Sequence, residues 1–292
     1  MNKVLGINER NHALYRLNSK EAFVLAKDKL ATKNLLALHG IPVPQTYLII
    51  RDHVDILELN DLPYSEFVIK PNKGSVGSGI LVLKKKDGKF FSPTGKAYDF
   101  QEIRKHVKNI LDGEYSGDDD TVLVEERIRF TDQLSSLPVL GLPDIRVICI
   151  EYKPVMAMVR WPTELSSGKA NISIGAYGLA VDMETGRITN VHAKVGKVDG
   201  DAVLARCTVP VPDWEYIKNI SGEASRLMGL GYSGVDIVLR DDGTVCILEM
   251  NGRSGLEIQN VNKLSLRTFL SNVVTKDLIE DRVTIPHKAA WM

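Results

Sequence analysis

Two short apolar segments that carry polar residues at fixed positions constrain the fold of this chain more than any other feature. Residues 234–239 and 245–250 are separated by an Asp-Gly turn, which is typical of a β-hairpin. Asp236 lies in the first segment, and Glu249 and Asn251 lie at the end of the second. Because strand residues two apart point to the same face, Glu249 and Asn251 share a face that Asp236 can reach across the hairpin.

Two carboxylates and an amide oxygen are the hard ligands that Mg²⁺ prefers when it also binds phosphates. The alternative is a pair of acidic residues on a solvated sheet face. The neighbours of Glu249, residues 246–248 and Met250, are apolar, and burying charge among them without a metal or partner would be costly. We therefore predict a metal site formed by these three oxygen donors.

A glycine-rich turn, Lys-Gly-Ser-Val-Gly-Ser-Gly at residues 73–79, follows an apolar strand that ends at Lys70. Glycines allow the backbone to approach a ligand closely, and consecutive N–H groups form an anion-binding concavity. A Walker loop is excluded, because no Gly-Lys-Ser/Thr ending is present. Many hairpins carry such turns without a ligand, but the ammonium group of Lys70 could meet a phosphate.

A second glycine pattern, at residues 229–234, matches the dinucleotide-binding motif letter for letter. That motif functions only after a strand and at the start of a helix. Here it follows a helical pattern and leads into a strand. We therefore interpret it as a helix end followed by a tight turn.

Arg146 begins one apolar strand and Arg160 ends the strand paired with it, with Lys169 and Asn171 in the segment that follows. Guanidinium groups match the geometry of phosphate and carboxylate oxygens. On spacing alone, surface arginines at strand ends are the better interpretation.

The remaining periodicity predicts helices mixed with antiparallel hairpins, hence an α+β fold and not a doubly wound sheet. Asp28 and Asp213 are expected to cap two of the helices, and Asp118-Asp-Asp120 to form a solvated loop. The expected helices cover residues 28–38, 100–111, 213–228 and 257–270; the expected strands cover residues 46–50, 66–70, 80–84, 121–125, 145–150, 154–159, 175–182 and 187–192, besides the hairpin described above.

The composition excludes several classes of protein. Lys plus Arg and Asp plus Glu both number 37 in 292 residues, so no broad electrostatic attraction to nucleic acid or membrane surfaces is expected. No apolar run is long enough for membrane insertion, and the N-terminus lacks the apolar core of a secretory signal. Three widely spaced cysteines predict neither a disulfide framework nor a metal site. A cytoplasmic location is therefore expected.

The order of these segments resembles that of ATP-grasp ligases, from about Lys27 to Glu257. Within that superfamily the chain looks most similar to the α-L-glutamate ligase-like branch, relatives of the ribosomal-protein glutamate ligases. The segments that carry the resemblance are residues 28–33, 40–44, 68–71, the glycine-rich turn, 122–126, 144–146, 160–163, 169–171, 234–236 and 249–256.

The resemblance implies an ATP-grasp fold in which two α+β lobes clamp ATP. It implies a short N-terminal segment, residues 1–27, in place of the full domain that usually precedes the core. The ATP-grasp domain would cover residues 28–275, with a small lobe at about 43–125 and a larger metal-binding lobe at about 126–275. Residues 276–292 would form a tail.

The resemblance also assigns roles by motif position, all of them expectations. It implies catalytic roles for Arg146, Arg160 and Asn171, and substrate contacts for Lys169 and Arg253. Nucleotide binding would involve Lys29 and Lys70, the loop residues Gly74, Ser75, Gly77, Ser78 and Gly79, and the adenine-binding segment Glu125, Glu126, Arg127 and Ile128; Mg²⁺, or alternatively Mn²⁺, would be held by Asp236, Glu249 and Asn251.

The implied activity is that of a carboxylate–amine ligase that consumes ATP and forms an amide bond through an acyl phosphate. Its substrates would be glutamate, another amino acid or a peptide, and a homo-oligomer is compatible with this interpretation. Two alternatives are an ATP-grasp phosphotransferase and a non-catalytic ATP-binding regulatory protein. Residues 8–11, Asn-Glu-Arg-Asn, are a speculative substrate contact, although such a segment is more often a mobile terminus.

Overall fold

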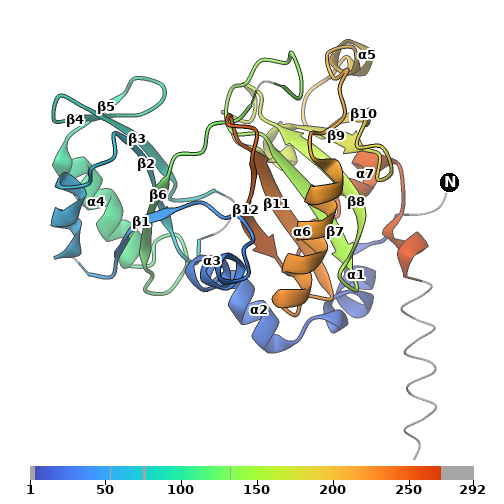
Figure 1. The fold of residues 1–292 in the computed structure, drawn as a ribbon, viewed down its shortest axis with the longest axis horizontal. Coiled ribbons are helices and arrows are strands. Elements are labelled where there is room, and N and C mark those ends of the chain that lie inside the picture. Colours follow the sequence, from blue (N-terminus) through green and yellow to red (C-terminus); the bar gives the residue numbers. More distant parts are fainter. Residues whose placement is uncertain (1–3, 53, 75–76, 132, 271–292) are drawn as a thin grey trace, which may run out of the picture.

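The computed structural model describes residues 4–52, 54–74, 77–131 and 133–270. Ser75 and the predicted tail, residues 276–292, lie outside the described residues. The described chain forms two six-stranded antiparallel sheets, one in each of two lobes that lie side by side (Figure 1). The predicted α+β class is confirmed.

The small lobe contains a sheet whose strand order is β1-β6-β2-β3-β4-β5. Burial alternates along β2, where Phe67 and Ile69 point into a core closed by helix α4 and the 3₁₀ helix η2. A capping box, in which Asp99 and Glu102 each accept the other's backbone N–H, fixes the start of α4. The bounds are β1 Thr46–Ile50, η2 Asp55–Asn60, β2 Glu66–Pro71, β3 Leu81–Lys86, β4 Lys89–Phe91, β5 Ala97–Tyr98, α4 Phe100–Leu111 and β6 Val122–Glu126.

The large lobe contains a sheet whose strand order is β10-β9-β8-β7-β11-β12. Helix α6 packs on one face with α2 and α3, and α7 packs on the other with η1 and η4. Both faces of the sheet are therefore covered, and every residue of β11 is buried. The bounds are α1 Ile7–Ala13, η1 Tyr15–Leu17, α2 Lys20–Lys27, α3 Lys29–Leu38, β7 Asp144–Ile150, β8 Lys153–Trp161, η3 Ile172–Ile174, β9 Tyr177–Val181, β10 Ile188–Ala193, α5 Gly200–Leu204, α6 Trp214–Leu227, β11 Tyr232–Leu239, β12 Val245–Asn251, α7 Ile258–Asn262 and η4 Leu266–Phe269.

Helix α3 joins the lobes, because it packs on the large lobe while its first turn contacts the small one (Figure 1). As predicted, Asp28 caps the helix by accepting the N–H of Ala31 at 2.8 Å. The preceding backbone donor, the N–H of Leu30, binds the side-chain oxygen of Asn72 at 2.8 Å. The start of α3 is thus tied to the chain that leaves β2.

Three local predictions are wrong. Asp213 stands at the start of α6 but adopts a left-handed conformation, φ 51°, and its side chain makes no cap hydrogen bond. The helix predicted at residues 257–270 is broken at Lys263, φ 52°, into α7 and η4. Asp120 is buried, whereas Asp118 and Asp119 are exposed as predicted.

The second glycine pattern behaves as interpreted. Gly229, with φ 65°, follows α6, and Gly234 lies within β11.

The three cysteines are free and buried. None of the helices within the described part of the chain is long and apolar enough to cross a membrane. The domain limits at residues 27 and 275 stay predictions.

Candidate active site

The predicted metal-binding residues meet at one end of the large sheet. Strands β11 and β12 pair so that Asp236 stands opposite Glu249, and Gly234 stands opposite Asn251. The amide nitrogen of Asn251 donates to a carboxylate oxygen of Asp236 at 3.2 Å. The side chain of Glu249 is 34% exposed, so this carboxylate is accessible to a ligand.

Two arginines hold the carboxylate of Asp236. Arg146 donates to both of its oxygens, with Nη2 at 2.7 Å, and Arg160 Nη2 donates at 2.9 Å. Burial raises the pKa of Asp236, but Arg146 and Arg160 outweigh burial and hold it below its usual value. Asp236 is therefore an ionised carboxylate fixed in one orientation.

Asp144 is a functional candidate that the sequence reasoning missed. Arg160 binds it through Nε at 2.6 Å and Nη2 at 2.5 Å, and thereby bridges Asp144 to Asp236. Burial raises the pKa of Asp144, and Arg160 opposes that effect. Asp144 lies two residues before Arg146 and therefore on the same face of β7, a signal that was present in the sequence.

The donor set at this hairpin suits a hard divalent cation. No cluster of three or more His, Cys, Asp or Glu side chains that could hold a metal occurs within the described ranges. A cation here would therefore need the amide oxygen of Asn251 as well as the carboxylates of Asp236 and Glu249. This chemistry fits Mg²⁺.

On the small lobe, a second buried carboxylate lies between two lysines. Glu125, 2% exposed, accepts from Lys33 and from Lys70, each with an N···O distance of 2.7 Å. The sequence reasoning missed Lys33, although it lies one helical turn after Lys29 on α3. Burial lowers the pKa of Lys33, and Glu125 opposes that effect.

Lys29 lies between this cluster and the metal-binding hairpin. Its ammonium group contacts the carbonyl oxygens of Gly74 and of Asn72, the latter at 3.3 Å. It also lies 3.8 Å from a carboxylate oxygen of Glu249. Burial lowers the pKa of Lys29, and Glu249 opposes that effect most strongly. Lys29 thus connects the glycine-rich turn to the predicted metal site.

The glycine-rich turn is fixed at its base. Both carboxylate oxygens of Asp120 accept the N–H of Lys73, at 2.9 and 3.1 Å, which explains why Asp120 is buried. A Cβ on Gly79, φ 74°, would lie 2.8 Å from Tyr115, so only glycine fits there. Among the described residues, no hydrogen bond joins Gly77 or Ser78 to Lys29, Lys33 or Lys70.

At the end of β6 and just after it, the side chains bind other residues of the protein. Glu126 accepts from Arg240 at 2.6 and 3.0 Å and from the N–H of Gln45 at 2.7 Å. Arg127 pairs with Glu66 at 3.2 Å. The backbones of Glu125 and Glu126 also pair with β1 and β2, and the N–H of Glu126 donates to the carbonyl oxygen of Gln45 at 3.0 Å. The backbone groups that remain for a ligand are therefore those of residues 127 and 128.

Two predicted residues lie apart from these clusters. Asn171 caps η3 by accepting the N–H of Ser173 at 2.9 Å, and Lys169 is exposed. Within the described part of the chain, no hydrogen bond or ion pair joins either of them to Asp236. The structure therefore does not bring Lys169 and Asn171 into the Asp236 cluster.

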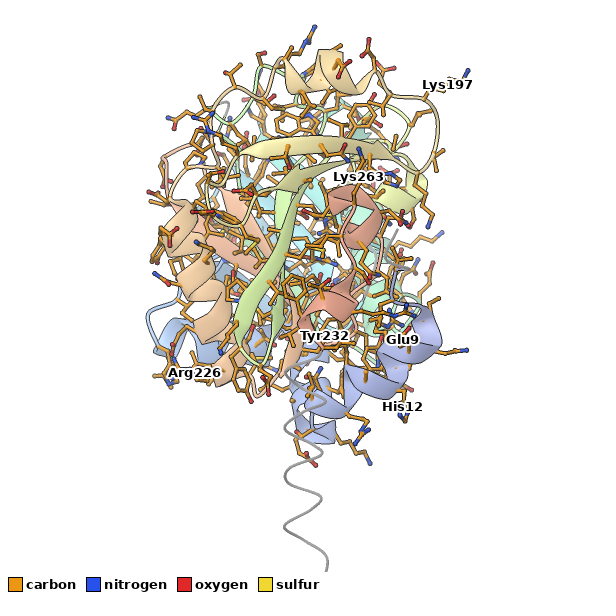
Figure 2. The ribbon with its side chains drawn as sticks, turned by 90° about the vertical axis from the view of Figure 1, so that its right-hand side faces the viewer. Glu9, His12, Lys197, Arg226, Tyr232 and Lys263 are labelled. Carbon is orange, nitrogen blue, oxygen red and sulfur yellow. The ribbon has the colours of Figure 1, made fainter. Side chains whose placement is uncertain are left out.

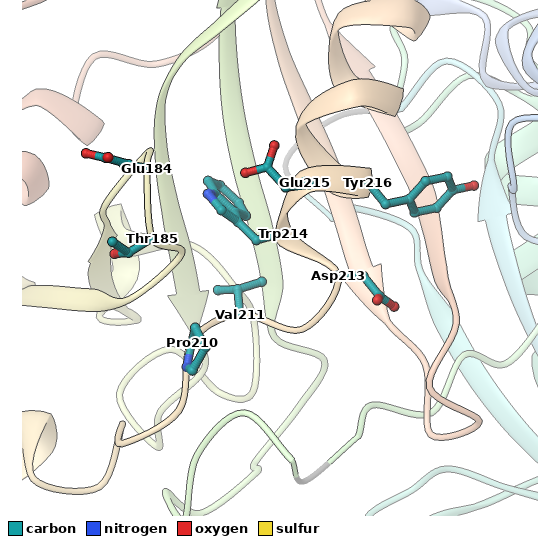
Figure 3. Close-up of a pocket in the computed structure, with 8 residues that line it drawn as sticks. All are labelled: Glu184, Thr185, Pro210, Val211, Asp213, Trp214, Glu215 and Tyr216. Carbon is teal, nitrogen blue, oxygen red and sulfur yellow. The ribbon is translucent and has the colours of Figure 1, made fainter.

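Two open cavities lie away from the candidate site. One, of about 470 Å³, lies at the start of α6, where Trp214 and Tyr216 line it together with the turn before β10 (Figure 3). The other, of about 460 Å³, is lined by residues 133–137 and 205–209. Neither is lined by a residue predicted to bind nucleotide, metal or substrate.

Comparison with known proteins identifies relatives of the whole arrangement. A "Probable alpha-L-glutamate ligase" of Xanthomonas oryzae pv. oryzae (strain MAFF 311018) is 24% identical over 245 residues, covering 83% of this chain and 62% of the relative. "Beta-citrylglutamate synthase B" of Homo sapiens is 20% identical over 244 residues, covering 82% of this chain and 47% of the relative. The chain thus spans less than two thirds of the length of these relatives.

Solved structures share the fold. The ATP-grasp ligase PsnB, solved with precursor peptide PsnA2 and AMPPNP, matches with a TM-score of 0.53 and 16% identity, covering 89% of this chain and 61% of that one. At this identity the likeness concerns the fold alone. The family described as sugar-transfer associated ATP-grasp matches residues 9–275, so this chain belongs to that ATP-grasp family.

Proposed function

We propose that this protein is a ligase that uses Mg-ATP to join a carboxylate to an amine through an acyl phosphate. One observation carries the proposal: Lys29 lies between the glycine-rich turn and Glu249, beside the hairpin that also presents Asp236 and Asn251. The ATP-grasp fold and the names of the relatives support it.

The proposed nucleotide site combines both lobes. Asp236, Glu249 and Asn251 would hold Mg²⁺, or alternatively Mn²⁺, which neutralises phosphate charge when bound. Lys29 and Lys70 would contact the phosphates, with the glycine-rich turn over them. The backbone of residues 127 and 128 would bind adenine, since the side chains of Glu125, Glu126 and Arg127 have partners within the protein.

In the proposed first step, an oxygen of the substrate carboxylate attacks the γ-phosphorus of ATP, and ADP leaves. In the second, an amine attacks the acyl carbon, loses a proton, and inorganic phosphate leaves. Arg146 and Arg160 would stabilise the negative charge on the transferred phosphoryl group while keeping Asp236 in place. Asn171 is proposed to assist there after a movement of its loop.

The proposed substrates are an amino acid, such as glutamate, or a peptide, together with an amine. The names of the glutamate ligases and of the peptide-bound PsnB structure support this range. Lys169 and Arg253 are proposed substrate contacts. A cytoplasmic location and a homo-oligomer stay predictions.

ADP release in the presence of candidate amino acids and peptides, followed by mass spectrometry of the product, tests the proposal. Hydroxylamine trapping should give a hydroxamate, which distinguishes an acyl phosphate from the alkyl phosphate of a phosphotransferase. Glu249→Gln should abolish turnover, whereas Glu58→Gln, an exposed residue of the small lobe, should not. Full activity of the Glu249 variant would refute the metal assignment.

A further inference from the structure

Two arginines from opposite ends of the described chain meet at one aromatic ring. The guanidinium carbon of Arg10, on α1, lies 4.8 Å from the ring centroid of Tyr15. That of Arg253, in the turn after β12, lies 5.7 Å from the same centroid and 5.1 Å from that of Phe23. Residues 8–11, which include Arg10, lie in helix α1, and Arg10 and Glu9 bind Ser254 and Arg267 of the large lobe (Figure 2 labels Glu9 and His12 on this helix).

Neither guanidinium group has an acidic partner among the residues that the structure describes. Arg10 donates to the side-chain oxygen of Asn11, at 3.1 and 3.3 Å, and to the carbonyl oxygen of Ser254 at 3.1 Å. Arg253 is exposed, and its guanidinium group contacts the two aromatic rings but no carboxylate among the described residues. Arg146 and Arg160, by contrast, are both neutralised by carboxylates. The guanidinium groups of Arg10 and Arg253 beside Tyr15 therefore carry positive charge that no carboxylate of the described residues neutralises.

Ser254 connects this unneutralised pair to the candidate active site. Its carbonyl oxygen accepts from Arg10 and, at 3.2 Å, from the hydroxyl of Tyr232. Its own hydroxyl accepts from Arg146 Nη1 at 3.0 Å, and Arg146 in turn holds Asp236. The two arginines thus lie beside the strand end that carries the predicted metal ligands.

The geometry points to a binding subsite, formed by Arg10 and Arg253, for an oxyanion carried by the substrate away from the bond that is made. The ligand chemistry is a carboxylate or a phosphate monoester, because a guanidinium group can donate two parallel hydrogen bonds to either group. In Arg10, Nε and Nη2 each donate one hydrogen to Asn11 and Nη1 donates one to Ser254, which leaves a second hydrogen on each of Nη1 and Nη2 for a ligand. The rings of Tyr15 and Phe23 contact the guanidinium groups through cation–π interactions. This inference rests on the proposed ligase function for its role and on the arginine geometry for its existence.

Binding, without turnover, tests the subsite. Isothermal titration calorimetry of the full chain, with its phosphate sites saturated by Mg-AMPPNP, would compare L-glutamate with L-glutamine and O-phospho-L-serine with L-serine. We expect at least one acid to bind about tenfold or more tightly than its neutral partner, since a charged fork discriminates strongly against a missing oxyanion. The pair that discriminates identifies carboxylate or phosphate as the preferred group.

Variants test whether the discrimination between acidic and neutral ligands depends on Arg10 and Arg253. Arg10→Gln and Arg253→Gln should each remove most of the discrimination, while Arg104→Gln, an exposed arginine on α4, should retain it. Absence of discrimination in both pairs, or its survival in both subsite variants, would overturn the inference. Discrimination without ATP-dependent amide formation on any substrate would refute the ligase proposal and leave the subsite standing.

Discussion

Two clusters bury carboxylates beside pairs of basic side chains, one in the large lobe and one at the small lobe, and the two differ in their balance of charge. In the large lobe, Arg146 and Arg160 face Asp236 and Asp144, so the charges cancel. At the small lobe, Lys70 of β2 and Lys33 of α3 share Glu125 alone. The arginine cluster therefore holds its carboxylates with no excess of charge, whereas the lysine cluster has one more positive than negative group, which is compatible with the phosphate contact proposed for Lys70.

The basic residues also differ in chemistry. A guanidinium group stays protonated at any accessible pH, whereas a buried ammonium group can lose its proton. The two arginines should therefore stay charged when a neighbouring carboxylate is removed or the pH is raised. The lysine cluster, where burial already lowers the pKa of Lys33, should respond to pH.

The largest expected effect is that of Asp236→Asn. It leaves Arg146 and Arg160 sharing Asp144 alone in a buried site, which should cost about 3–5 kcal/mol of the free energy of unfolding and abolish turnover. Urea denaturation measures the cost, and Asp118→Asn, at an exposed position, serves as the control. A loss below about 1 kcal/mol would show that the arginines do not depend on this carboxylate.

Glu125→Gln should destabilise less, by about 1–3 kcal/mol near neutral pH. It removes the shared counterion, so the pKa of Lys33 should fall further below its value in the unfolded chain. The unfolded chain then binds more protons, and stability should rise with pH until that unfolded pKa is reached. Urea denaturation at about pH 7 and about pH 9.5 would detect this recovery.

The same pH change should not rescue Asp236→Asn, because its arginines cannot deprotonate. Parallel recovery of both variants would remove the distinction between the two clusters.

Gly79→Ala tests how far the phosphate side depends on backbone geometry. The left-handed φ alone should cost about 1 kcal/mol, and the clash with Tyr115 should add to it. Gly95→Ala is the matched control, because its φ of 85° is also left-handed but its Cβ would meet open space. Thermal denaturation of both variants separates the cost of the left-handed backbone from the cost of the clash. Equal losses of stability in the two variants would mean that Tyr115 moves aside without a measurable cost.

The smallest effect concerns His106, whose ring nitrogen lies 2.9 Å from the carbonyl oxygen of Gly79. Burial lowers the pKa of His106, an effect that its bond to Gly79 and the charge of Glu114 oppose. The neutral ring is thus favoured in the folded state, so stability should be full above the unfolded pKa, about 6.5, and fall as the pH drops below it. His106→Gln should flatten this part of the stability profile, and His12→Gln should not.

The helices and strands predicted from the sequence agree with the structure where local sequence signals determine their bounds. The start of α3 at Asp28, the bounds of α4 and the hairpin of β11 with β12 all follow from capping residues, periodicity and turn chemistry. The break at Lys263 was missed, since nothing in the local pattern marks a left-handed residue there.

Contacts between distant strands could not be predicted in the same way. Lys33 and Glu125 are 92 residues apart and meet only because α3 packs beside β6. Arg160 on β8 reaches across β7 to bind both Asp144 on β7 and Asp236 on β11, a contact that depends on the order of these three strands in the sheet. The motifs thus named Asp236, Glu249, Asn251, Arg146 and Arg160, which lie together in the structure, but also Lys169 and Asn171, which lie apart from Asp236. The roles assigned to these residues stay predictions.

The bond between the start of α3 and Asn72 has a mechanical consequence. The helix belongs to the large lobe by packing, whereas the N–H of Asn72 donates to the carbonyl oxygen of Thr121 beside the small sheet, so this bond attaches the first turn of α3 to both lobes. Lys29 lies in that turn. The position of its ammonium group beside Glu249 is therefore anchored from both sides of the molecule.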